Sequence, residues 1–132
     1  MDLLITVAAI LVIVSLALAW VASLTLYLKI PALVKVFPSA FQLVRAHIDY
    51  LLMAMLLGVF VLLGDRQGVS YAAWLRWMMV IGAVYNPLGF VVLATRTERG
   101  PKPGFETWAT LVGFIPATLG FGGAAVVLLA NL

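Results

Sequence analysis

Four long runs of apolar residues, separated by three shorter polar segments, dominate the chain. The runs cover about residues 3–28, 42–63, 71–94 and 107–130. An α-helix needs about 20 residues to cross the ~30 Å hydrocarbon core of a bilayer, and each run is that long. The pattern predicts an all-α membrane protein with a single domain over residues 1–132. We expect four transmembrane helices in an antiparallel bundle, with both termini on one side.

The three polar segments differ in character. Residues 64–68 read as a tight turn, and residues 96–106 form a hydrophilic loop that contains Gly-Pro-Lys-Pro-Gly. In residues 31–41, by contrast, Val34 and Phe37 recur at helical spacing. This spacing predicts that part of the first connection lies in the plane of the membrane interface.

Composition supports the membrane assignment and helps to orient the chain. Of the residues, 65% are hydrophobic and only 10% are charged, whereas roughly a quarter are charged in soluble domains. The Lys and Arg residues fall mainly in or beside the first and third loops, which membrane topology explains without nucleic acid. By the positive-inside rule these loops are cytoplasmic. We therefore expect a protein of the bacterial inner membrane with periplasmic termini.

The residue inventory excludes several kinds of site. The chain has no cysteine, which excludes disulfides, thiolate iron–sulfur clusters, covalently attached haem and a cysteine nucleophile. With one histidine, it also lacks the ligands for a zinc site.

The single histidine, His47, and Asp49 stand where the second apolar run begins. An ionisable residue inside a transmembrane segment is costly to insert, so it marks a candidate functional site. The alternative interpretation is that both are interfacial polar residues that end a helix. Tyr50, one turn after His47, shares its helical face.

An antiparallel hairpin of the second and third runs places four polar residues at one depth. Residues equally far from the intervening turn lie level, because both helices rise ~1.5 Å per residue. Position 47 then matches position 87, so His47 and Asp49 share a layer with Tyr85 and Asn86. We expect this layer, together with Tyr50, to form the site.

The third and fourth runs also carry packing signals. Pro87 interrupts the third run and frees backbone carbonyls, which a membrane helix tolerates when neighbours bond to them. The fourth run has small residues at intervals that favour close helix packing, namely Gly113, Ala117, Gly120 and Ala124. We expect Gly113, Gly120 and Gly123 to permit close packing between subunits of a homo-oligomer.

A lone imidazole in an apolar four-helix setting suits haem, because helical bundles build cofactor sites from side chains on facing helices. One histidine per chain excludes two histidine ligands from the same chain. The iron would be five-coordinate, His/Met-ligated or bridged by a second subunit. A five-coordinate iron leaves one face open to a substrate oxygen or nitrogen.

Two segments resemble a known family. Arg45–Ala46–His47 with the following Leu51–Met55 run, and the segment Asn86–Phe90, are similar to the second and third helices of styrene oxide isomerase and the related hydroxylaminobenzene mutases. The resemblance implies a homotrimeric membrane isomerase with haem b held by His47. Ferric iron would then act as a Lewis acid on a small hydrophobic epoxide, which rearranges to a carbonyl compound by a 1,2-shift.

The chain departs from the family pattern at several positions. It has Met53 where styrene oxide isomerase has an Asn. The third-helix Asp and Tyr of the family correspond to Gly82 and to Phe90 or Val91. The candidates to replace these polar groups are Asn86, Tyr85, Asp49 and Tyr50. Two further functions stay open: a haem protein for electron transfer or sensing, and a cofactor-free membrane subunit or transporter.

Overall fold

The computed structural model describes residues 1–97 and 104–132, and all regular secondary structure in these residues is helical. The helices are α1 (Asp2–Leu26), α2 (Pro31–Val36), α3 (Phe41–Gln67), α4 (Ala73–Ala94) and α5 (Phe105–Leu129). Four of them, all except α2, are long and apolar enough to cross a membrane.

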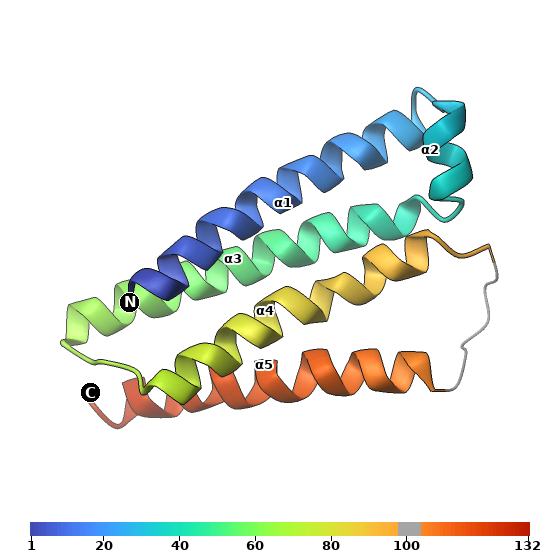
Figure 1. The fold of residues 1–132 in the computed structure, drawn as a ribbon. Coiled ribbons are helices and arrows are strands. Elements are labelled where there is room, and N and C mark those ends of the chain that lie inside the picture. The colour runs from blue at the N-terminus through green and yellow to red at the C-terminus, as the bar shows by residue number, and fades with distance from the viewer. Residues whose placement is uncertain (98–103) are drawn as a thin grey trace.

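The predicted four-helix antiparallel arrangement is confirmed. The long helices run alternately in opposite directions, and the N- and C-termini lie at the same end of the molecule (Figure 1). Their bounds agree with the apolar runs to about one turn, and the largest difference is that α3 continues to Gln67. The extra turn ends at Gly68, which adopts a left-handed conformation with φ of 65°. Glycine tolerates this conformation because it has no Cβ.

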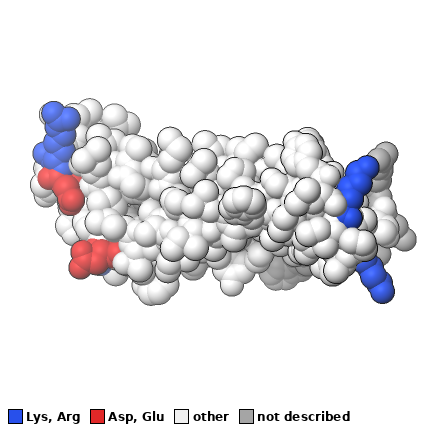
Figure 2. All heavy atoms as spheres, turned by 90° about the horizontal axis from the view of Figure 1, so that it is seen from above, with Lys and Arg blue, Asp and Glu red and all other residues white. Residues whose placement is uncertain are grey.

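The four long helices form a row. α1 packs against α3, α3 against α4, and α4 against α5, whereas α1 and α5 do not touch within the described residues (Figure 1). The two inner helices, α3 and α4, are therefore covered by neighbouring helices on two sides, and the rest of their surface does not contact the described part of the protein. Figure 2 shows that charged side chains gather at the two ends of the molecule and are absent from the middle of the face in view.

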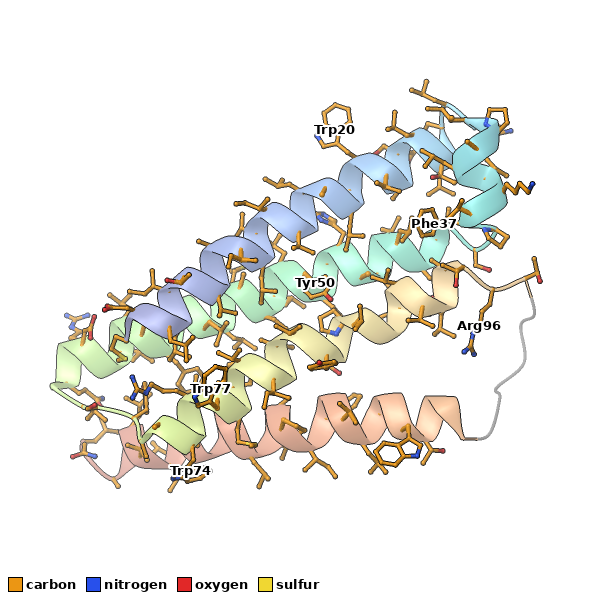
Figure 3. The ribbon with its side chains drawn as sticks, viewed as in Figure 1. Trp20, Phe37, Tyr50, Trp74, Trp77 and Arg96 are labelled. Atoms are coloured by element: carbon orange, nitrogen blue, oxygen red, sulfur yellow. The ribbon has the colours of Figure 1, made fainter. Side chains whose placement is uncertain are left out.

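The spacing of buried residues shows which stripe of each helix meets protein. The buried positions of α3 recur at intervals of three and four residues, at Leu43, Ala46, Tyr50, Ala54, Leu57, Val61 and Gly64. This spacing places them on one narrow stripe of the helix. On the remaining faces of the long helices, large apolar side chains are exposed. Trp20 of α1, for example, is 69% exposed and projects away from the row (Figure 3). Helices that are apolar on every side suit a surrounding of lipid.

Small residues bring α4 and α5 into close contact. A Cβ added at Gly82 would meet the backbone of Ala117, and one added at Gly120 would meet the backbone of Met79. The close packing predicted for the fourth run is thus confirmed. The expectation that glycines of this run pack against another subunit is wrong, because Gly113, Gly120 and Gly123 all face α4 of their own chain.

Two polar contacts join α3 and α4 at the end of the molecule away from the chain termini. The backbone N–H of Ser39 donates to the carbonyl of Ala94 at 3.1 Å, and its Oγ donates to the carbonyl of Arg96 at 2.8 Å. These contacts hold the start of α3 against the end of α4. The short helix α2 lies across this end (Figure 1) and buries none of its residues. Its orientation agrees with the predicted segment in the membrane interface.

The glycine contacts predict that a methyl group added at Gly120 destabilises the protein and that one added at Gly58 does not. Gly120→Ala should destabilise the protein by about 1–3 kcal/mol, because the new Cβ must displace backbone atoms of α4. Gly58→Ala is the matched control, since a Cβ there meets nothing within 4 Å. Unfolding by SDS in mixed micelles measures both variants. Equal stability of the two would contradict the packing described.

Candidate functional site

His47 of α3 lies against Ser15 of α1. Its Nδ1 is 2.8 Å from the Ser15 Oγ and 2.9 Å from the Ser15 carbonyl oxygen. The same hydroxyl donates to the carbonyl of His47 at 2.9 Å. Ser15 is fully buried, with an exposed fraction of 0%, and His47 is partly buried. Two side chains 32 positions apart in the chain thus join α1 to α3 through three short contacts.

The pair lies well inside two helices that are long and apolar enough to cross a membrane. Ser15 is 13 residues from the start of α1 at Asp2 and 11 residues from its end at Leu26, or roughly 20 Å and roughly 16 Å along the axis. His47 follows the start of α3 at Phe41 by six residues. The imidazole therefore does not end a helix, and the structure places it opposite the middle of α1.

Asp49 occupies a different flank of α3. Residues two apart on a helix do not share a face, and Asp49 is partly buried without a hydrogen bond or ion pair to any residue that the structure describes. Arg45, four residues earlier, is close enough in sequence to pair with it. The guanidinium carbon of Arg45 lies instead 5.5 Å from the ring centroid of Phe41, toward the start of the helix.

Tyr50 connects α3 with the proline-containing turn of α4. Its hydroxyl donates to the carbonyl of Val84 at 3.1 Å, and Tyr50 lies between the two helices (Figure 3). The contact agrees with the predicted register, in which position 47 is level with position 87. Tyr50 and Val84 each lie three residues closer than these positions to the turn between α3 and α4. Pro87 cannot donate to the carbonyl of Ala83, and the Tyr50 hydroxyl bonds to the carbonyl of the next residue, Val84, in the same turn.

Tyr85 and Asn86 share the depth of this layer but occupy other surroundings. Tyr85 is 46% exposed on the outside of α4. The backbone of Asn86 lies beside Gly113 of α5, since a Cβ at Gly113 would come within 2.8 Å of the Asn86 Cα. The structure therefore brings His47 together with Ser15 and brings Tyr50 together with Val84. It does not bring the five predicted site residues around one point within a single chain.

Gly82 is closely packed against α5. The site of its missing Cβ is filled by the backbone of Ala117. A carboxylate at this position would require α4 and α5 to separate.

The described residues contain no group of three or more His, Cys, Asp or Glu side chains that could hold a metal ion. The site therefore offers one nitrogen ligand, the Nε2 of His47. This atom makes no hydrogen bond to the described residues, because the contacts of the ring go through Nδ1.

Ser15 is the site residue that sequence reasoning missed. Its hydroxyl is one of several in the first run, alongside Thr6, Ser23 and Thr25. The available signal was its spacing, because Ser15 falls on the same stripe of α1 as the buried residues Leu4, Leu11 and Ala22.

The chain matches no family model, and no curated protein or solved structure is detectably similar to it.

Removal of the Tyr50 hydroxyl should weaken the contact between α3 and α4. We expect Tyr50→Phe to destabilise the protein by about 1 kcal/mol, because the hydrogen bond from its hydroxyl on α3 to the carbonyl of Val84 on α4 is lost. Tyr85→Phe is the control and should leave stability unchanged, since the Tyr85 hydroxyl bonds to none of the described residues. The free energy of unfolding in detergent measures both variants. A Tyr50→Phe variant as stable as Tyr85→Phe would contradict the role of the Tyr50 hydroxyl in joining α3 to α4.

Proposed function

We propose that the protein is an integral membrane haem b protein in which Nε2 of His47 ligates the iron. One observation carries this proposal: the only imidazole lies within a membrane-spanning helix, its Nδ1 is engaged by Ser15, and its Nε2 has no partner among the described residues. In metal-ligating histidines, the N–H of the other ring nitrogen commonly donates a hydrogen bond to a backbone carbonyl or a carboxylate.

The residues fit haem better than a free metal ion. The porphyrin supplies four nitrogen ligands, so a single protein ligand suffices to hold it. A zinc or iron ion without a porphyrin needs several protein ligands, and the described residues offer no such cluster. The apolar surroundings of α1 and α3 suit the hydrophobic macrocycle.

The open row of helices supports assembly into a homo-oligomer. With α1 and α5 apart, four helices in a row do not enclose a macrocycle, so haem would lie near a surface shared by two subunits. The resemblance to styrene oxide isomerase favours a trimer. The contacts between subunits would use the outer faces of the helices, because the glycines of α5 are occupied within the chain.

The proposed activity is isomerisation of a small hydrophobic epoxide to a carbonyl compound. Bound ferric haem would supply a Lewis acid for the epoxide oxygen. Asp49, Tyr85 and Asn86 have polar groups that bond to none of the described residues, so they are available to bind and orient substrate. The Tyr50 hydroxyl is engaged by Val84, and its role is to position α4.

The charge distribution supports an orientation. Lys29, Lys35, Arg45 and Arg96 lie toward the end that holds α2, whereas the end with the termini combines Asp2, Asp65, Arg66 and Arg76. The positive-inside rule then puts the α2 end in the cytoplasm and the termini in the periplasm of a bacterial inner membrane.

One observation favours a second candidate, a membrane subunit without a cofactor. The contacts of Ser15 with His47 join α1 to α3 without any ligand. In that case the histidine serves helix association alone.

The absorption spectrum of the purified protein tests both candidates. The wild type should show a Soret band, and His47→Ala should lose it, because no second histidine can replace the ligand. Tyr85→Phe and Asn86→Ala are the matched variants: both should keep the band. Their turnover of an aryl epoxide should fall about 10²–10³-fold, the usual effect of removing one positioned donor.

A colourless wild-type protein from cells supplied with haem precursor would favour the cofactor-free subunit. A Soret band that His47→Ala leaves unchanged would show that the ligand is elsewhere.

A further inference from the structure

The contacts between Ser15 and His47 determine where the ring proton lies. A carbonyl oxygen only accepts, so the 2.9 Å contact between Nδ1 and the Ser15 carbonyl requires a proton on Nδ1. The Ser15 hydroxyl has one proton, and it donates this proton to the His47 carbonyl at 2.9 Å. Its oxygen can then also accept from Nδ1–H at 2.8 Å. All three contacts are satisfied by this one arrangement.

We infer that Ser15 is a positioning residue that holds His47 as the neutral Nδ1–H tautomer with the lone pair of Nε2 free. The inference rests on the proposed function, in which Nε2 is the ligand of the haem iron. Ser15 touches neither substrate nor iron and acts through the imidazole. Hydrogen bonding to Nδ1–H also raises the basicity of the opposite nitrogen, which strengthens a bond to a metal.

Ser15 is well placed for this role because it approaches the ring with two groups at once. Its carbonyl accepts the Nδ1 proton, and its hydroxyl is anchored on the His47 backbone. Rotation of the ring about its bond to Cβ would lose both contacts of Nδ1 with the fully buried Ser15. An unpaired polar group is costly there, so the orientation of the ring is strongly favoured.

Another buried hydroxyl of α1 shows that this arrangement is specific to Ser15. Thr25 has an exposed fraction of 4%, and its Oγ1 donates to the carbonyl of Val21 at 2.6 Å, within its own helix. A hydroxyl in a membrane helix is often satisfied in this way. Ser15 instead bonds across to α3, and Thr25 therefore provides a matched control.

The single histidine allows a direct test by ¹⁵N NMR of protein labelled with [¹⁵N]histidine in detergent, without added haem. The spectrum has one imidazole to report. The wild type should show a protonated Nδ1 and an unprotonated Nε2 at neutral pH. Ser15→Ala keeps the backbone carbonyl that accepts from Nδ1–H but loses the hydroxyl that holds the ring against it, so its Nδ1–H signal should shift or broaden by exchange. Thr25→Val should match the wild type.

Hemin titration of the same three proteins provides the second readout. We expect Ser15→Ala to bind hemin about 10–100-fold more weakly than the wild type, as is typical when a partner of a metal ligand is removed. Thr25→Val should bind like the wild type. Ser15→Thr keeps a hydroxyl and should restore both the Nδ1–H signal and the affinity toward wild-type values.

The outcomes separate this inference from the proposed function. A wild-type imidazole protonated on Nε2, or a Ser15→Ala spectrum identical to that of the wild type, would overturn the role of Ser15. If Ser15→Ala does not fold, the wild-type spectrum alone still decides the tautomer. A wild type with the expected tautomer that binds no hemin would overturn the haem proposal and leave the positioning of His47 standing.

Discussion

The contact between Ser15 and His47 is the interaction on which the account of this protein depends. An imidazole opposite the middle of a transmembrane helix has no water to bond to, so each of its polar atoms must find a partner in the protein or a ligand. Ser15 provides partners for Nδ1 and for the His47 backbone. One nitrogen, Nε2, is left over. This nitrogen is the atom that we propose as the ligand of the haem iron.

The same constraint explains the other polar contacts of the helix row. Tyr50 donates to the carbonyl of Val84, one turn before Pro87 in α4, and Ser39 donates to the carbonyls of Ala94 and Arg96 at and just beyond the end of that helix. Between α4 and α5, contact is made by glycine and alanine backbones instead of polar groups. The Asp49 carboxyl has no partner among the described residues, and neither do the buried atoms Gln42 Oε1, Gln67 Oε1 and Arg76 Nε.

Much of the fold follows from the sequence, and less of the site does. Length and hydropathy are enough to locate four spans, and the shared rise of α-helices gives the level of Tyr50 against Val84. The partner of His47 does not follow, because several hydroxyls of α1 are equivalent until the rotation of the helix is known. The level of a residue along a helix also does not show on which side of the helix it lies. Asn86 shares the layer of His47 yet lies beside α5. The glycines of α5 signal close packing without saying which helix they meet.

The most direct measurement of the central claim is resonance Raman spectroscopy of the reduced, haem-loaded protein with and without [¹⁵N]histidine. The chain has one histidine, so any iron–histidine vibration must come from His47. The account predicts an iron–nitrogen stretching band that moves to lower frequency on ¹⁵N labelling. A haem spectrum without such a band, or with bands insensitive to the label, would contradict ligation by Nε2 of His47.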